Sequence, residues 1–276
     1  MKTQNKFKIV ILVLSSNQLV AKINRMFQKI SWVTDYPNVK IIFYLGGYKK
    51  TELVSNDTLK LTSSKKFKDI GVKTIDSFEW VDNNLEYDFI FRTSASSFLF
   101  IPKLIEFVNK NCDNIDYSGV VAQAKYLGKD IKFASGSGYF VSKKIVSLIL
   151  NNKDLWNHKL IDDVALGEFL KEFNIEPFNF ERNSINVFPS YESMNYELFL
   201  TRCKINQFNL PRILEAFYML KLKNNYMIFN KNLKYNKNFE KINLFFIKII
   251  QKFYPRKLFP QFQNLHYKRY LKDLNN

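Results

Sequence analysis

Two adjacent carboxylates stand at the start of a helical pattern in the stretch LIDDVALGEFL, from Leu160 to Leu170. An Asp at a helix N-cap binds free backbone N–H groups and stabilises the helix by about 1 kcal/mol. One carboxylate is enough for that role, so the second is left over. An ionised carboxylate at a helix start can also accept a proton from a hydroxyl group as a general base. Capping and general-base catalysis are therefore the two interpretations of Asp162 and Asp163.

Two cations, Arg202 and Lys204, stand two residues apart just before another helical pattern. Side chains two residues apart on an extended segment share a face. Two cations on one face could hold a pyrophosphate, which an Arg binds bidentately. The alternative is a solvated edge strand followed by an ordinary helix.

Small residues dominate the stretch FASGSGYFVS, which runs from Phe133 to Ser142. Its glycines let the backbone approach a ligand closely or turn tightly before a strand. The Lys-Ser/Thr ending of a phosphate loop is missing. The stretch is either a ligand loop or a hairpin or loop into an edge strand, and as a ligand loop it would contribute Ser135, Gly136, Ser137 and Gly138.

A fourth stretch, EYDFIFRTSASSFLF, runs from Glu86 to Phe100. Its apolar run predicts a buried strand that ends near Arg92, and Thr93, Ser94 and Ser96 follow. Small hydroxyl residues at a strand exit are typical of a turn or a binding site. If this is a site, it carries no carboxylate, histidine or glycine of its own.

Short apolar runs that alternate with helix-length segments would position these residues. The alternation predicts an α/β sandwich with a largely parallel sheet, in which ligands bind at the carboxyl ends of strands. Small or polar residues follow the first three strands, as a shared ligand crevice requires. The predicted strands cover 9–14, 39–45, 89–92, 117–122 and 138–141, and the predicted helices cover 17–30, 65–81, 102–109, 143–151 and 164–173.

Positive charge is concentrated at one end of the chain. The 276 residues carry a net charge of +17, and 46% of them are hydrophobic, enough for one large domain or one domain with an appendage. From Thr201 onward the sequence holds 16 of the 42 Lys and Arg but 3 of the 25 Asp and Glu. We therefore expect a balanced domain over 1–205 and a basic, aromatic-rich helical extension over 206–276.

Several classes of protein are not predicted. The two cysteines, Cys112 and Cys203, and the two histidines, His158 and His266, have no metal-ligand spacing. A disulfide framework, a zinc site and a histidine-based triad are thus disfavoured. The apolar run Ile9–Leu14 is too short for a signal-peptide core or a membrane span, so we expect a cytoplasmic protein.

Taken in order, the motifs over 9–173 resemble the β-1,3-glycosyltransferase superfamily, which includes the fringe and β-1,3-galactosyltransferase enzymes. Arg25 and Trp32 stand near the places of an Arg and a Trp in that family's first helix, one residue further apart. The resemblance lies in the order of the motifs. The matching segments are LVLSSNQLVAKINRMFQKISWV, VKIIFYLGG, GVKTIDSFEWV, ASGSGYFVS and IDDVALG.

The resemblance implies a GT-A fold, a Rossmann-type αβα sandwich, and an inverting glycosyltransferase. Such an enzyme moves a sugar from a nucleotide-sugar, here a UDP-sugar, to a hydroxyl of a glycan or lipid-linked glycan. Asp163 corresponds to the family's general base, and Asp162 is left nearer to capping or acceptor binding. We expect the donor to be bound by Ser15, Ser16, Lys73, Arg92, Thr93, Ser94, Ser96, Arg202 and Lys204, and the loop to contribute Ser135, Gly136, Ser137 and Gly138.

The sequence departs from the family at one point. The family carries an Asp-x-Asp metal motif where this chain has Ser94-Ala95-Ser96, although Arg92 and Thr93 match the flank. Serines do not make a dicarboxylate site for Mn²⁺ or Mg²⁺, so we assign no metal ligand and doubt a divalent cofactor. Fixed cations, Arg202 and Lys204 with Arg92 or Lys73, could neutralise a leaving diphosphate instead. The alternative is a non-catalytic relative that binds nucleotide-sugars or carbohydrates.

The basic extension leaves three interpretations open. Ile242, Phe246, Ile249 and Phe253 form an apolar stripe that would pack a helix on the catalytic domain. Lysines beside that stripe also suit a helix on an anionic membrane surface, on the inner face of the membrane. Nucleic-acid binding would explain the charge, but no recognisable module supports it.

Overall fold

The computed structural model describes residues 6–185, 194–204 and 214–230. Its elements are β1 (Ile9–Leu14), α1 (Leu19–Ser31), β2 (Val39–Gly46), β3 (Glu52–Val54), β4 (Thr58–Leu61), α2 (Ile70–Asn84), β5 (Phe89–Ser94), β6 (Ser97–Leu99), α3 (Ile101–Asn111), β7 (Tyr117–Tyr126), β8 (Lys129–Ser142), α4 (Lys143–Asn151), α5 (Asp162–Lys171), β9 (Phe178–Asn179), β10 (Asn183–Ser184), β11 (Leu200–Arg202) and α6 (Leu214–Asn230).

The described strands form a mixed eight-stranded sheet in the order β3-β4-β2-β1-β5-β8-β7-β9 and a small sheet in the order β10-β11-β6. The strands β4, β2, β1 and β5 run parallel to one another. Strand β8 is antiparallel to both β5 and β7. The predicted α/β architecture with a largely parallel central sheet is confirmed.

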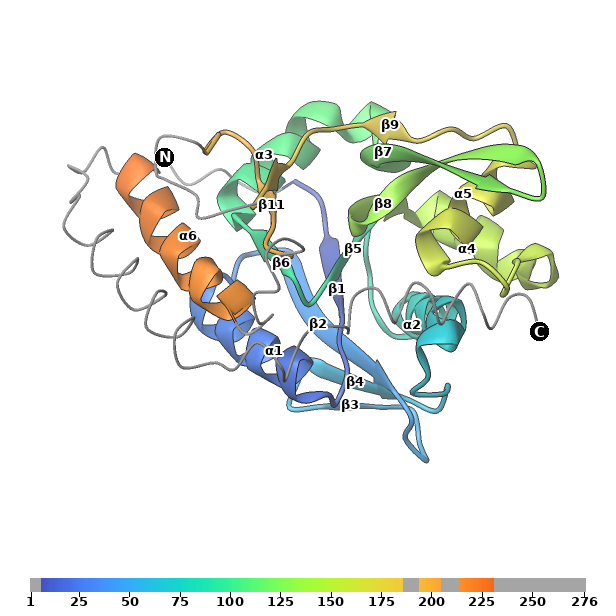
Figure 1. The fold of residues 1–276 in the computed structure, drawn as a ribbon, viewed down its shortest axis with the longest axis horizontal. Coiled ribbons are helices and arrows are strands. Elements are labelled where there is room, and N and C mark those ends of the chain that lie inside the picture. Colours follow the sequence, from blue (N-terminus) through green and yellow to red (C-terminus); the bar gives the residue numbers. More distant parts are fainter. Residues whose placement is uncertain (1–5, 186–193, 205–213, 231–276) are drawn as a thin grey trace, which may run out of the picture.

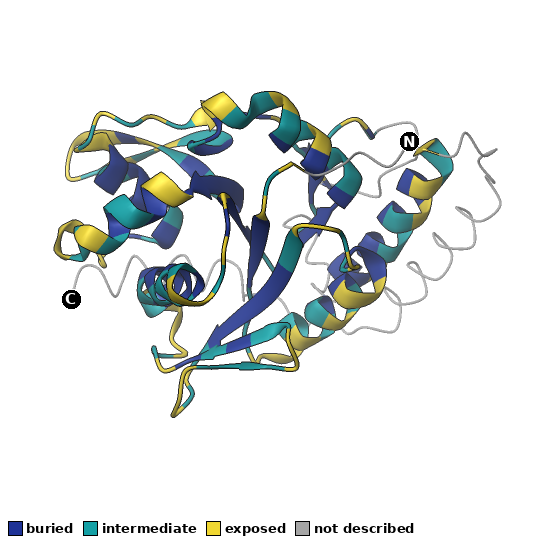
Figure 2. Ribbon diagram, turned by 180° about the vertical axis from the view of Figure 1, so that it is seen from behind, coloured by how far each residue is buried: buried dark blue, intermediate teal, exposed yellow. Residues whose placement is uncertain are grey.

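Alternation along β1 divides the core into two layers. Ile9, Ile11 and Val13 pack into one cluster, and Val10 and Leu12 pack into the other. Because successive side chains of a strand point to opposite faces, both faces of the sheet are buried. Helices α1 and α6 lie side by side on one face, whereas α2, α4 and α5 cover the other (Figure 1). The central strands are accordingly the most buried part of the fold (Figure 2).

The structure differs from the sequence predictions in several places. The hairpin β3–β4 was not predicted, and the helix expected over 65–81 begins at Ile70 after a short 3-10 turn. Strands β7 and β8 are longer than predicted because they pair far beyond the buried run, out to Tyr126 and Lys129. The segment 135–138 lies inside β8, and β11 lies between β10 and β6. Both edge-strand alternatives are therefore wrong.

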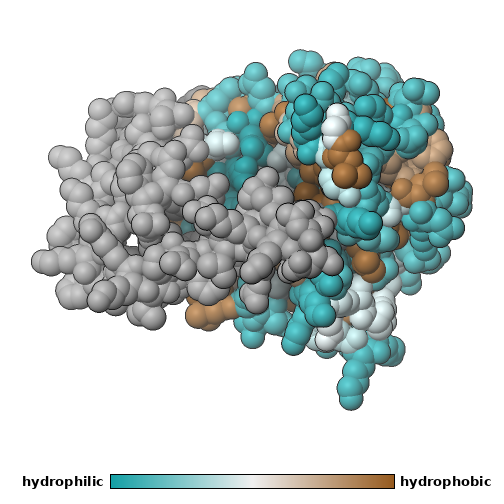
Figure 3. Space-filling view, turned by 45° about the vertical axis from the view of Figure 1, so that its right-hand side comes forward, coloured by the Kyte–Doolittle hydropathy of each residue, from teal (hydrophilic) through white to brown (hydrophobic). Residues whose placement is uncertain are grey.

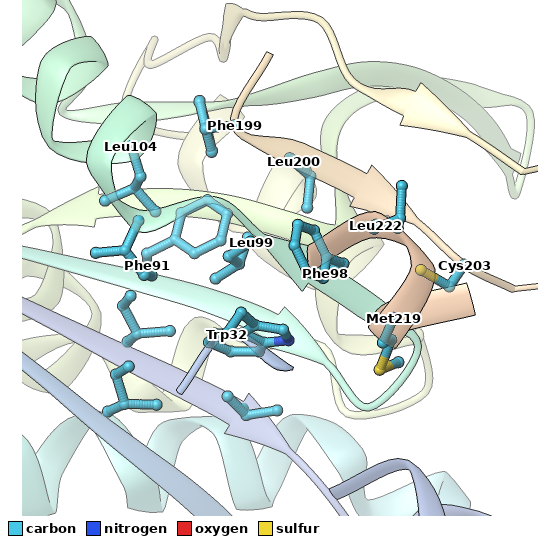
Figure 4. Packing of buried hydrophobic residues seen from close by; sticks show 14 of the residues in the cluster. Trp32, Phe91, Phe98, Leu99, Leu104, Phe199, Leu200, Cys203, Met219 and Leu222 are labelled. Carbon is cyan, nitrogen blue, oxygen red and sulfur yellow. The ribbon is translucent and has the colours of Figure 1, made fainter. Parts of the chain in front are cut away.

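Helix α6, the described part of the basic extension, packs on the same cluster as β1 and β5. Met219 and Leu222 lie against the small sheet beside Phe98, Leu200 and Cys203 (Figure 4). In its range, the packing interpretation therefore agrees with the structure. The apolar stripe expected over 242–253 lies outside the described residues, and the domain division at 205 stays a prediction.

In the view of Figure 3, the described surface is mainly hydrophilic, with hydrophobic residues in small separate patches. Within the described residues, no helix has both the length and the apolar character that crossing a bilayer requires.

Met219→Ala tests whether α6 is part of the core. Met219 is fully buried, so the change should lower the free energy of unfolding by about 2–5 kcal/mol through lost contacts and a cavity. Met227 on the same helix is 41% exposed, and Met227→Ala should stay within about 0.5 kcal/mol of the wild type. Urea denaturation measures both variants. Equal effects would show that α6 does not stabilise the core.

Candidate active site

The carboxyl ends of the central parallel strands meet at one edge of the sheet. Leu14 at the end of β1 lies opposite Tyr44 of β2 and Ser94 of β5. Gly46 of β2 lies opposite Leu61, the last residue of β4. The residues that follow these strands are thereby brought close together, as the sequence predicted.

A buried ion pair between Arg92 of β5 and Asp162 of α5 forms the centre of this region. Arg92 Nη2 lies 2.5 Å from Asp162 Oδ2, and both side chains are 2% exposed. Thr74 of α2 also donates to Asp162 Oδ2, at 3.1 Å. Burial lowers the pKa of Arg92, but the Asp162 carboxylate together with Tyr44 and Tyr139 more than offsets this, and the net shift of the pKa is upward. Asp162 is thus held as a charged partner inside the protein.

Arg92 has further partners on two other strands. Its Nε donates to Tyr44 Oη at 3.1 Å, and its Nη1 donates to the carbonyl of Gly136 in β8 at 2.7 Å. The guanidinium also lies over the Tyr139 ring, 5.6 Å from its centroid. Arg92 is therefore fixed from several sides, and its role in this structure is to join β2, β5, β8 and α5.

Asp163 differs from its neighbour in both burial and contacts. Its side chain is partly exposed, Oδ2 accepts from Gly136 N at 2.6 Å, and Oδ1 accepts from Val164 N at 3.0 Å. Burial and the charge of Asp162 raise its pKa to about 6. Helix α5 has Ile161 at its N-cap, with no side-chain cap bond, so the capping interpretation of Asp162 is wrong.

The hydroxyls of the RTSASS stretch mostly bond within the protein. Thr93 Oγ1 and Ser97 Oγ donate to the carbonyl of Ser137, at 2.6 and 2.7 Å. Gln28 of α1 donates to the carbonyls of Ser94 and Ser97, at 3.1 and 2.9 Å. These contacts fix the turn between β5 and β6. Of the predicted donor-binding hydroxyls in this stretch, only that of Ser94 belongs to a half-buried residue.

A buried carboxylate from α6 also contacts this turn. Glu215 is 0% exposed and accepts from Ser96 Oγ at 2.7 Å and from Asn24 Nδ2 of α1 at 2.9 Å. Ser96 is thus aimed at Glu215. The sequence analysis missed Glu215, because a single Glu in an apolar helix carries no local motif.

Lys73 and the serines after β1 line the neighbouring strand ends. Lys73 is 6% exposed, donates to the carbonyl of Lys66 at 2.9 Å, and has a pKa lowered by burial. A Cβ on Gly46 would lie 2.8 Å from Lys73 Cδ, so glycine permits this close approach. Ser15 Oγ is buried and has no hydrogen-bond partner among the described residues, whereas Ser16 Oγ accepts from Gln18 N at 3.3 Å.

The predicted cations Arg202 and Lys204 lie at and just beyond the end of β11, and both are half-buried. Arg202 lies opposite Ser97 of β6 and Ser184 of β10. A third cation, Arg182, donates from Nη1 to Ser135 Oγ at 3.1 Å and to Ser137 Oγ. The sequence analysis missed Arg182, which stands alone in FERNS with no motif to mark it.

The predicted loop residues lie in β8 between these groups. Ser135 and Ser137 point to the opposite face of β8 from Gly136. Asp163 and Arg92 therefore lie on one face of this segment, and Arg182 lies on the other. A Cβ on Gly136 would lie 3.0 Å from both Arg92 Nη1 and Asp163 Oδ2. Gly138 pairs with Thr93, and a Cβ there would meet the Phe91 ring at 2.6 Å.

The residues present do not fit a divalent metal ion. Ser94 and Ser96 carry no carboxylate, and the Glu215 carboxylate is buried and accepts hydrogen bonds from Ser96 and Asn24. Within the described ranges, no group of three or more His, Cys, Asp or Glu could hold a metal. We therefore derive no step through a metal ion at this site.

Asp162→Asn and Asp163→Asn should lower stability to different extents. Asp162→Asn leaves the Arg92 charge buried and uncompensated, so we expect a loss of about 3–5 kcal/mol in the free energy of unfolding. Asp163→Asn removes a carboxylate whose ionised form is disfavoured, but it also removes one of the two oxygens that accept from Gly136 N and Val164 N, so the loss at neutral pH should be smaller than that of Asp162→Asn. Chemical denaturation of both variants measures this difference. A larger loss for Asp163→Asn would contradict the assignment of the ion pair to Asp162.

No protein-family model matches the chain, and no curated protein sequence matches it. Among solved structures, the apo form of the glycosyltransferase GlyE from Streptococcus pneumoniae TIGR4 is similar, with a TM-score of 0.40 and 12% sequence identity. The match covers 83% of this chain and 64% of that one. The chain thus shows a distant structural similarity to one glycosyltransferase. A likeness this distant carries no argument about activity.

Proposed function

We propose that the chain is an inverting glycosyltransferase that moves a sugar from a UDP-sugar to a hydroxyl of a glycan or lipid-linked glycan. The observation that carries the proposal is the division of roles between two adjacent carboxylates. Asp162 is closed off by Arg92, whereas Asp163 is partly exposed and has a pKa of about 6. A carboxylate with a pKa near the working pH is suited to be a general base. The order of the sequence motifs supports the same activity.

Asp163 would act on the acceptor. Its carboxylate takes the proton of the acceptor hydroxyl while the oxygen forms a bond to the anomeric carbon of the sugar. The bond from that carbon to the nucleotide diphosphate breaks, and its electron pair leaves with the diphosphate. A single displacement of this kind inverts the anomeric configuration. The ion pair with Arg92 leaves Asp162 unavailable as a second, nucleophilic carboxylate.

The donor would bind along the carboxyl ends of β1, β2 and β5. Ser15 offers a buried hydroxyl without a partner among the described residues, and Ser94 offers a half-buried one. Arg202 and Lys204 would neutralise the charge that develops on the diphosphate, and Lys73 would add to this field. We assign Arg92 and Ser96 to holding Asp162 and the turn in place, because their donors already have partners in the protein.

A second candidate function is that of a non-catalytic relative that binds a nucleotide-sugar or a carbohydrate. The loss of both carboxylates at Ser94 and Ser96 favours it, because the family places its metal there. The two candidates differ in turnover and agree in binding. An experiment that measures both quantities on the same variants therefore separates them.

Asp163→Asn should abolish transfer while it preserves donor binding. Loss of a general base lowers the rate about 10²–10⁴-fold, whereas Asn keeps the shape of the side chain and its acceptor oxygen. A panel of sugar nucleotides is screened by thermal stabilisation, and the donor found is then assayed for turnover. Asp154→Asn, an exposed change, serves as the control. Donor binding without any turnover by the wild type would instead establish the non-catalytic candidate.

The pH dependence of the wild type tests the same assignment. The base must be ionised, so kcat/KM should rise with pH and level off above a midpoint of about 6. Stability should change in the opposite direction. Because the folded state binds the Asp163 proton more tightly than the unfolded chain does, this group lowers the free energy of unfolding as pH rises from about 4 to about 6. A rate that falls over this range would exclude Asp163 as the base.

A further inference from the structure

Arg182 has an unusual set of partners for a half-buried guanidinium. Its Nη1 donates to the hydroxyls of Ser135 and Ser137, and its Nε donates to Ser184 Oγ at 3.4 Å. All of these acceptors are neutral, and Arg182 takes part in none of the ion pairs found within the described residues. Its positive charge is therefore partly desolvated and not neutralised by a carboxylate there.

A second arginine lies close to the first. Arg202 lies opposite Ser184 in the pairing of β10 with β11, and opposite Ser97 in the pairing of β11 with β6. Ser184 Oγ accepts a hydrogen bond from Arg182, and Ser97 Oγ donates one to the Ser137 carbonyl. Burial lowers the pKa of Arg182, and the charge of Arg202 lowers it further, to about 10. The two like charges are close enough to repel each other.

Two like charges close together in a partly buried place attract an anion that can contact both. Guanidinium groups bind phosphate oxygens bidentately, and they are less strongly hydrated than the ammonium group of a lysine. Serine hydroxyls beside them can donate further hydrogen bonds to the same oxygens. The chemistry of the cluster thus matches a polyphosphate better than a single carboxylate.

We propose that Arg182 and Arg202, with the hydroxyls of Ser135 and Ser137, form a binding site for a diphosphate group. This assignment deepens the proposed function and rests on it in one respect, namely that the diphosphate belongs to the nucleotide-sugar donor. It places a second cation, Arg182, in the same site as Arg202, and the sequence did not reveal this cation. It also places the main anion contacts on β8 and β10–β11 instead of on the RTSASS turn.

The position of this site relative to Asp163 follows from the alternation of side chains along β8. Neighbouring residues of a strand point to opposite faces. Gly136 faces Asp163 and Arg92, whereas Ser135 and Ser137 beside it contact Arg182. The base and the diphosphate site therefore lie on opposite sides of the same short segment of β8.

Pyrophosphate binding to the full chain tests the proposal without any need for turnover. Isothermal titration compares the wild type with Arg182→Gln and with Lys129→Gln, an equal loss of charge at an exposed position. We expect Arg182→Gln to weaken pyrophosphate binding by about tenfold or more, as for a lost charge-assisted contact. Lys129→Gln should change it by less than about twofold. Equal affinities for the two variants would overturn the site.

Arg182→Lys provides a second variant in case the Gln variant does not fold. It keeps the charge but loses the planar fork, so its affinity should fall between those of the wild type and Arg182→Gln. Affinity equal to that of the wild type would contradict bidentate binding by Arg182. Far-ultraviolet circular dichroism verifies that each variant is folded before it is titrated.

Titrations with UDP and with uridine identify the source of the diphosphate. If the donor's diphosphate binds here, Arg182→Gln weakens UDP by the same factor as pyrophosphate and leaves uridine unchanged. Unchanged UDP binding would overturn the assignment to the donor. If Arg182→Gln weakens pyrophosphate binding but the protein turns over no sugar nucleotide, the proposed function is refuted and the diphosphate site stands. If the protein turns over a sugar nucleotide but Arg182→Gln leaves the affinity for pyrophosphate unchanged, the diphosphate site is refuted and the proposed function stands.

Discussion

The buried ion pair between Arg92 and Asp162 is the interaction on which the rest of the site depends. Removing two charges from water is costly, and hydrogen bonds offset this cost: Arg92 donates to Tyr44 and to the Gly136 carbonyl, and Thr74 donates to Asp162. These partners come from β2, α2 and β8, so one cluster ties helices α2 and α5, which cover the same face, to the central sheet. Burial and the charge of Asp162 then raise the pKa of the adjacent Asp163.

A second constraint comes from the far end of the chain. Glu215 of α6 bonds to Ser96 in the turn after β5, from 119 residues away in sequence, and to Asn24 of α1. The buried polar face of α1 also holds this turn through Gln28. Helix α6 is thus part of the structure that shapes the site. A chain that ended before α6 would leave Ser96 and Asn24 without their shared acceptor.

The sequence predicted the features that local patterns encode. Apolar runs and helical periodicity located the main strands and helices. The same patterns predicted Asp163 at the start of a helix, and the order of motifs indicated its role as the base. The partners of Arg92 followed from no pattern, because they lie on three other elements, β2, β8 and α5, that only the tertiary fold brings together. Arg182 and Glu215 were missed for the same reason. The length of strand β8 was underestimated, because pairing with β7, and not burial, extends the strand to Lys129.

The central claim is that Asp163, the more accessible of the two carboxylates, acts as the general base in a single displacement at the anomeric carbon. The configuration of the first-formed product tests it most directly. With a nucleotide donor whose sugar is α-linked, proton NMR during the first turnovers should show the β-anomer, because a single displacement inverts the anomeric carbon. Product that forms first as the α-anomer would require a second displacement, and it would contradict the assignment of Asp163 as a lone general base beside a sequestered Asp162.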